Sequence, residues 1–167
     1  MTTKQEYTNE EWARLIRAPL VAGLAISIAD PGGPIEMAKE VVASLKTMRT
    51  PPTNDELVVE VSREISALAE RRENPIGDFR PKGPDAPQQV LEELRAANRI
   101  LEKATPGEAD AYRRWIVDAA RAAADAAKEG GFMGFGAEQV SEGEQRMLDD
   151  VSSAIGLSPG EVPGRPD

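Results

Sequence analysis

Three carboxylates beside the glycine-rich turns of the chain are its best candidates for binding a metal ion. Asp30 follows the first apolar segment, and Glu129 and Glu138 flank the glycine-rich stretch at residues 130–136. Carboxylate oxygens, in a chain without histidine or cysteine, suit Mg²⁺ or Ca²⁺. Because exposed carboxylates are common and no EF-hand pattern is present, solvated surface charge is the other interpretation. We therefore expect no cofactor, with Mg²⁺ or Ca²⁺ at these three residues as the alternative.

Aromatic residues in the loops form the second candidate site. The three phenylalanines, Phe79, Phe132 and Phe135, all lie in segments rich in glycine and proline, and Met133 stands between two of them. Buried, these groups would fold back onto the helix ends; exposed, they would form a patch for a partner. If both loops lie at one end of the fold, the rings would form one cluster: a cap, a ligand pocket or a partner surface. We expect the loop at residues 129–140 to bind a protein partner or a second copy of the chain, as in a homodimer.

The residue types that the chain lacks exclude several classes of function. Its 167 residues include no cysteine and no histidine, so disulfides, thiolate metal sites, most hydrolase triads and most zinc sites are excluded. The net charge of −9 argues against nucleic-acid binding, in which a protein must neutralise phosphates. No pair of groups suited to acid–base catalysis stands out on an apolar face. We expect a non-enzymatic binding or scaffold protein.

Helix signals run through the chain, and no run of alternating β-branched residues predicts a strand. Six segments carry apolar residues at the helical period, and most of them begin with a residue pair typical of a capping box. The expected boxes are Thr8 with Glu11, Thr53 with Glu56, Asp85 with Gln88, Thr105 with Glu108, and Ser141 with Glu144. The sequence therefore predicts an all-α fold, a compact bundle of about six helices.

The first helix is expected to lie buried at the centre of this bundle. From residue 18 to residue 29 it is uncharged and apolar on every face, which is typical of a helix surrounded by neighbours. Leu24 and Ile28 are expected among its buried residues, and Pro19 should kink or restart the helix. The alanine-rich face of the fifth helix allows close approach, so that helix is the expected neighbour.

The same segment bears on the location of the protein. A membrane span needs roughly 20 apolar residues, and the longest uncharged apolar run here has only twelve. The N-terminal residues are polar and lack the apolar core of a signal peptide. We expect no contact with a membrane and a cytoplasmic location.

The domain organisation is expected to be simple. Residues 1–157 form a single helical domain, and residues 158–167, rich in proline and glycine, form a flexible C-terminal tail. The first and second helices, joined by a Gly-Gly turn, resemble the fifth and sixth helices in arrangement. An internal helix–loop–helix pseudo-repeat is therefore expected.

Three short segments resemble the tellurite-resistance TerB-like proteins. They are IADPGG at residues 28–33, VSEGE at residues 140–144 and AIGL at residues 154–157. In that family an Ala-Asp-Gly turn precedes a capped helix that ends in Leu-Gly-Leu; here Pro31 replaces the glycine, and Glu129-Gly130 stands for the second turn. The resemblance implies a small all-helical, stress-associated protein whose acidic turns bind divalent cations. This is the alternative to a partner-binding function.

Overall fold

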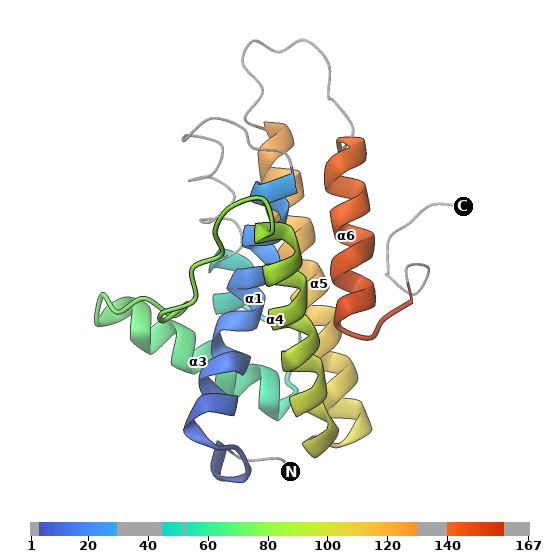
Figure 1. Cartoon of the computed structure of the whole chain (residues 1–167). Helices are drawn as coiled ribbons and strands as arrows, with labels where there is room; N and C mark the ends of the chain where they lie inside the picture. The colour runs from blue at the N-terminus through green and yellow to red at the C-terminus, as the bar shows by residue number, and fades with distance from the viewer. Residues whose placement is uncertain (1–3, 30–44, 52, 130–139, 159–167) are drawn as a thin grey trace.

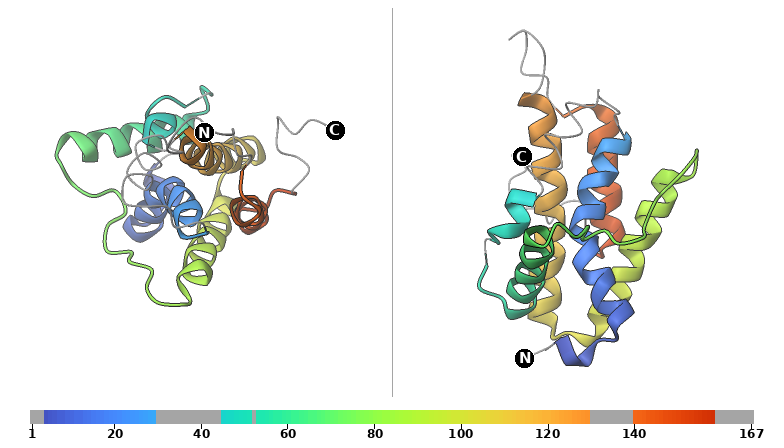
Figure 2. Two further views of the ribbon diagram at one scale, coloured as in Figure 1. Left: turned by 90° about the horizontal axis from the view of Figure 1, so that it is seen from above. Right: turned by 90° about the vertical axis from the view of Figure 1, so that its left-hand side faces the viewer.

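The computed structural model describes residues 4–29, 45–51, 53–129 and 140–158, and in these ranges every regular element is a helix. Residues 45–49 are also helical. Four long helices lie alongside one another and α3 lies across them (Figures 1 and 2). The elements are the 3₁₀ helix η1 (Lys4–Glu6), α1 (Asn9–Ala29), α3 (Glu56–Glu70), α4 (Ala86–Ile100), the 3₁₀ helix η2 (Leu101–Lys103), α5 (Pro106–Glu129) and α6 (Glu142–Ala154). The prediction of an all-α bundle is confirmed.

Helix α1 lies at the centre of the bundle, as its apolar sequence predicts. Val21, Ala22 and Ile26 are fully buried, and the most extensive contacts of α1 are with α5 and α4. Small residues on both α1 and α5 let the two backbones approach closely. Leu24 and Ile28, in contrast, are only half-buried, so the most deeply buried face of α1 is the one that carries Ile26.

Pro19 lies inside α1, and the helix continues through it without a restart. Proline has no N–H group, so the carbonyl of Leu15, four residues earlier, loses its usual helical donor. The hydroxyl of Tyr112 on α5 donates a hydrogen bond to this carbonyl. Both residues are fully buried. A side chain from the neighbouring helix thus supplies the donor that Pro19 removes, and the helix does not restart at Pro19.

Capping boxes start three of the helices as predicted. The hydroxyl and carboxylate pairs Thr8 with Glu11, Thr105 with Glu108, and Ser141 with Glu144 each bond to the partner's backbone N–H. The expected box at Thr53 and Glu56 is wrong, because Asp55 is the N-cap of α3 and accepts from the N–H of Val58. Asp85 is the N-cap of α4, but its side chain makes no capping hydrogen bond, so the expected box with Gln88 does not form. Its backbone is not in the extended conformation that directs an N-cap side chain toward the N–H groups of the first turn.

The segment between α3 and α4 is a structured loop that crosses the face of α1 (Figure 1). Phe79 is partly buried and packs against the core. The side-chain amide of Gln89 bonds to both the N–H and the carbonyl of Lys82, which ties the end of the loop to α4. The loop starts at Arg72, whose φ of 59° is left-handed. An aromatic anchor at Phe79 in the middle and a side-chain clamp at Lys82 near the end therefore fix this segment.

Tyr7 and Trp12 close one end of the core beside α1. Both are buried, and their ring centroids are 5.7 Å apart. Burial, followed by the nearby carboxylate of Glu108, raises the pKa of the Tyr7 hydroxyl to about 12. This hydroxyl therefore stays protonated at neutral pH.

One described helix is long and apolar enough to cross a membrane by length and composition, and it is α1. The mean hydropathy of its most apolar window is 1.4, so the apolar stretch of this helix is longer than the uncharged run of twelve residues suggests. In the fold, however, 67% of the most apolar window is buried among the other helices. The apolar length of α1 is accounted for by its place in the core.

Candidate functional site

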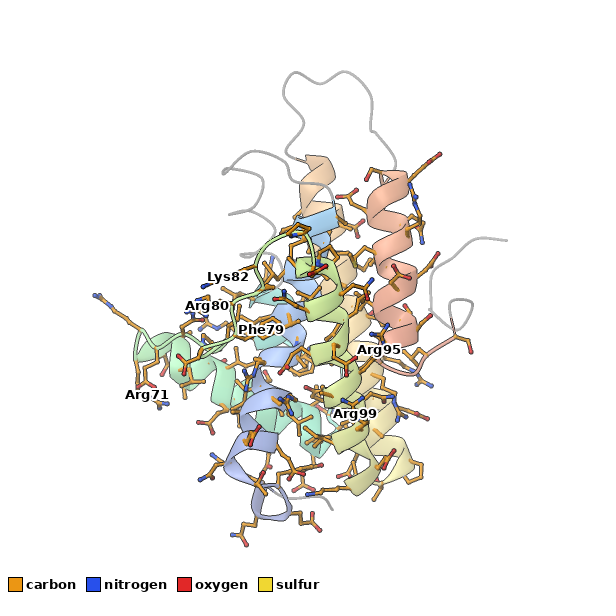
Figure 3. All side chains as sticks on the ribbon, in the orientation of Figure 1. Arg71, Phe79, Arg80, Lys82, Arg95 and Arg99 are labelled. Atoms are coloured by element: carbon orange, nitrogen blue, oxygen red, sulfur yellow. The ribbon has the colours of Figure 1, made fainter. Side chains whose placement is uncertain are left out.

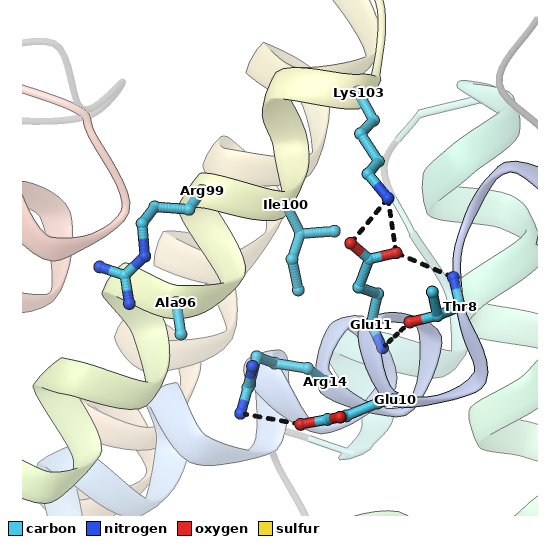
Figure 4. A pocket seen from close by; sticks show the side chains of 8 residues that line it. All are labelled: Thr8, Glu10, Glu11, Arg14, Ala96, Arg99, Ile100 and Lys103. Atoms are coloured by element: carbon cyan, nitrogen blue, oxygen red, sulfur yellow. Dashed lines mark hydrogen bonds and ion pairs between the residues drawn. The ribbon is translucent and has the colours of Figure 1, made fainter.

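A hollow of 410 Å³ lies where the start of α1 meets the end of α4 and η2 (Figure 4). Ile100 and Ala96 on α4 form its apolar floor, and charged side chains from both helices form its rim. Its volume is within the usual range of ligand sites. The lining residues are Thr8, Glu10, Glu11, Arg14, Ala96, Arg99, Ile100 and Lys103.

Arg14 is held at the rim by a nearly buried ion-pair triad. Its Nε lies 2.9 Å from Oε1 of Glu93, and Nε of Arg17 lies 3.4 Å from the same oxygen. The Glu93 side chain is only 10% exposed, so water screens this triad weakly. Two guanidinium groups share one carboxylate, which leaves an excess positive charge. The remaining contact of Arg14, from Nη2 to Glu10, is long at 3.9 Å.

Lys103 and Glu11 form the wall of the hollow nearest the start of α1. The Lys103 Nζ lies 2.7 Å from the Glu11 carboxylate, which also accepts a 2.8 Å bond from the N–H of Thr8. The Lys103 ammonium, then the Thr8 N–H, hold the pKa of the Glu11 carboxyl below its ordinary value. Glu11 is therefore ionised at neutral pH and serves as a cap and an ion-pair partner.

Arg99 and Arg95 extend the positive charge along the exposed face of α4 (Figure 3). Their guanidinium groups lie 3.1 Å and 3.4 Å from the carboxylate of Glu92. The bond from Arg99 is the largest cause that lowers the pKa of the Glu92 carboxyl. All three side chains are exposed, with solvent around the ion pairs.

This arrangement suits binding an anion more than acid–base chemistry. Arg14, Arg99 and Lys103 line the hollow, and an apolar floor lies between them. A ligand with a carboxylate and an apolar part could therefore contact the cations and the floor at the same time. A general base works best with a pKa near the working pH, and the pKa of the Glu11 carboxyl is moved away from it. Within the described residues, no three acidic side chains are grouped so that they could hold a metal ion.

The structure brings only some of the sequence-predicted site residues into view. Phe79 anchors the α3–α4 loop on the core rather than standing free. The other three interaction candidates, Phe132, Met133 and Phe135, lie outside the described residues.

The side chains of the three predicted metal ligands also lie outside the part of the chain that the structure describes. Asp30 and Glu138 lie outside the described residues, and of Glu129 only the backbone is described, at the end of α5. The start of α6 does approach the end of α1, since a Cβ built on Gly143 would lie 3.2 Å from the carbonyl oxygen of Ala29. Two of the segments that carry the TerB-like resemblance are therefore neighbours in space.

The residues of the hollow were missed in the reading of the sequence. One signal was present: Arg99 and Lys103, which line the hollow, are four residues apart, a spacing typical of neighbours on one helix face. Arg14 lies 85 residues before Arg99, and the sequence alone gives no pairing between the two helices. No protein-family model, curated protein or solved structure matches the chain. The function is therefore argued from the site.

Proposed function

We propose that the protein is a non-enzymatic binding protein, and that the hollow between α1 and α4 recognises a carboxylate-bearing segment of a partner protein. The observation that carries this is a rim on which three cations outnumber two carboxylates, Glu10 and Glu11, over a floor of apolar residues. Nearly buried Glu93 holds one of these cations, Arg14, at 2.9 Å, and a cation already held in place loses little freedom on binding. An anion that enters the hollow therefore meets donors that are already positioned.

The overall charge supports a partner that is recognised locally rather than through long-range attraction. The chain carries a net charge of −9, so an acidic partner is repelled at a distance and held only where cations gather. The apolar floor favours a polypeptide over a free inorganic anion, because methylene and methyl groups gain from covering half-buried Ala96 and the small part of Ile100, 7%, that is still exposed. We also propose a cytoplasmic location, because the one helix apolar enough to cross a membrane is mostly buried in the core.

The test is calorimetric titration of the protein with hexaglutamate at low and at physiological salt. The double variant Arg99→Gln/Lys103→Gln removes two rim charges, and each exposed ion pair lost should weaken binding by up to about fivefold. The control Arg114→Gln/Arg146→Gln removes two exposed charges from α5 and α6 and should leave the affinity unchanged. Equal weakening in both double variants would show general charge attraction and would end the proposal.

The loop at residues 129–140 is a second proposed surface, carried by its sequence. Its residues Phe132, Met133 and Phe135 would serve as apolar anchors for a partner or for a homodimer. We expect Phe132→Ala/Phe135→Ala to weaken self-association with little change in the melting temperature. Sedimentation and thermal unfolding, measured side by side, decide this. A large loss of stability with an unchanged oligomeric state would make the loop a structural plug.

Divalent-cation binding is the second candidate function, favoured by the approach of Gly143 to Ala29. This contact places the end of α1 beside the start of α6, and the TerB-like resemblance implies that the acidic turns bind divalent cations. Ca²⁺ should then raise the melting temperature, because a ligand that binds only the folded state stabilises it. Asp30→Asn should abolish the rise. Calorimetry without a heat of binding at millimolar Ca²⁺ would contradict this candidate.

A further inference from the structure

We infer that residues 4–7 form a hinged lid over Trp12, and that this lid opens at Thr8 while the rest of the bundle stays folded. The lid consists of the 3₁₀ helix η1 and Tyr7, and it lies at the end of the core where α1 begins (Figure 1). The inference does not depend on the proposed function.

Two polar atoms at the lid are buried without a hydrogen bond. Among the described residues, no group bonds to the indole N–H of Trp12 or to the hydroxyl of Tyr7, and both atoms are shielded from water. The two residues are only 4% and 7% exposed. The large majority of buried polar groups in proteins have a partner, and a group without one loses its hydrogen bonds with water on burial. Opening of the lid restores these bonds, so the two atoms favour the open form.

The apolar contact between the two rings favours the closed form. The ring of Tyr7 packs on that of Trp12 with the centroids 5.7 Å apart, and opening exposes both surfaces to water. The gain from burying one aromatic ring and the cost of two buried polar atoms without partners are of similar size. The closed form is therefore favoured by a small free energy, and the lid should open far more often than the whole protein unfolds.

Lys4 makes the other contacts that hold the lid closed. Its Nζ lies 3.1 Å from Oε2 of Glu64 on α3 and 5.7 Å from the centroid of the Trp12 ring. The side chains of Lys4 and Glu64 are 53% and 30% exposed, so water and dissolved ions screen the ion pair. Added salt should therefore weaken the closed form.

The start of α1 is stabilised by bonds that do not involve the lid. The N–H of Thr8 bonds to the carboxylate of Glu11, and Lys103 on η2 holds the same carboxylate. The hydroxyl of Thr8 accepts the N–H of Glu11 in return. The backbone bond from the N–H of Tyr7 reaches only Lys4, within the lid itself. Thr8 is therefore the hinge, because the bonds that follow it persist when the lid opens.

The test is hydrogen–deuterium exchange of the Trp12 indole N–H, followed by NMR of the ¹⁵N-labelled protein. The variant Trp12→Phe distinguishes its signal from that of Trp115. We expect a protection factor at least about tenfold lower than those of the backbone amides of Val21 and Ile26 in the centre of α1. The protection should not depend on urea below the unfolding transition, because a local opening exposes little surface.

Two variants should act on the lid in opposite directions. Tyr7→Phe removes an unpartnered polar atom and keeps the ring, so it should raise the protection of the Trp12 indole about two- to tenfold. Lys4→Gln removes the ion pair and should lower this protection about two- to fivefold, as should added salt in the unmodified protein. The control Lys46→Gln makes the same charge change at an exposed site and should leave the protection unchanged.

Three results would each overturn the inference. Exchange of the Trp12 indole with the rate and urea dependence of the Val21 and Ile26 amides would show that residues 4–7 open only when the whole protein unfolds. Unchanged or lower protection in Tyr7→Phe would show that the hydroxyl does not favour opening. Equal effects of Lys4→Gln and Lys46→Gln would show that the ion pair does not hold the lid. Circular dichroism melting checks that each variant folds, and the salt dependence of the unmodified protein tests the ion pair without a substitution.

Discussion

Replacing Tyr112 by phenylalanine is expected to destabilise the protein through a carbonyl on another helix. Leu15 cannot receive the usual helical N–H from Pro19, and its carbonyl accepts the hydroxyl of Tyr112 instead. Both Tyr112 and Leu15 are fully buried, so water cannot take the place of the hydroxyl without a cavity. Tyr112→Phe should therefore leave a buried acceptor without a donor, which costs about 1–3 kcal/mol.

The reasoning is tested by repeating the substitution after Pro19→Ala. Alanine restores an N–H at position 19, which can donate to Leu15 in the ordinary helical way. In that background Tyr112→Phe removes a hydroxyl that the helix no longer needs, and its cost should fall below about 1 kcal/mol. The double-mutant cycle should accordingly show a coupling of about 1–2 kcal/mol between Pro19 and Tyr112.

Urea unfolding of the four proteins provides the measurement. With a slope of about 2 kcal/mol per molar urea, a loss of 2 kcal/mol lowers the midpoint by about 1 M. The slope itself should stay constant, since none of the variants changes the surface exposed on unfolding. Equal costs of Tyr112→Phe in both backgrounds would refute the idea that the hydroxyl replaces a missing helical donor.

Three further predictions concern single positions and pH. Gly156→Ala should cost about 1–3 kcal/mol in chemical unfolding, because φ there is +85° and a Cβ would lie 2.9 Å from Nδ2 of Asn98; an unchanged stability would mean that this turn is not fixed. Arg72→Gly should raise stability by about 0.5–1 kcal/mol, since glycine adopts the left-handed φ of 59° without strain, and a loss instead would show that the side chain matters. The melting temperature should fall as pH rises from 10 toward 12, because a tyrosine in the unfolded chain releases its proton near pH 10 while Tyr7 in the folded protein has a pKa of about 12. Tyr7→Phe should make this fall less steep. An equally steep fall in that variant would show that Tyr7 is not the group responsible.

Much of the fold could be predicted from the sequence because helix periodicity and capping are local signals. The box at Ser141 and Glu144 and the glycine stop at Gly156 are each formed by residues a few positions apart. The start of α3 was misplaced for an equally local reason: Thr53 bonds to the N–H of Asp55, and Asp55 then caps the helix. Two candidate caps within three residues compete, and the pattern alone does not rank them.

Tertiary contacts account for what could not be predicted. The donor for the Leu15 carbonyl comes from Tyr112, 97 residues along the chain, and no local rule connects the two residues. The orientation of α1 was also beyond the pattern, since an all-apolar helix has no polar face to mark its exposed side. Leu24 was expected among the buried residues and is only half-buried.

The candidate site illustrates the same limit. Arg99 and the apolar floor residues Ala96 and Ile100 all belong to α4, but only packing of α1 against α4 adds Arg14. The aromatic and acidic loop residues that stand out in the sequence do so by composition, which says nothing about what lies across from them. When a site is built from two segments far apart in the sequence, each of its residues taken singly looks like any other surface residue, so the sequence does not mark the site.

Mapping of backbone amide shifts in the ¹⁵N-labelled protein, titrated with hexaglutamate, tests the central claim most directly. The claim predicts saturable shifts concentrated on Arg14, Ala96, Arg99, Ile100 and Lys103, which diminish as salt is added. Shifts spread evenly over the surface, or concentrated on other helices while these five amides stay unmoved, would contradict it.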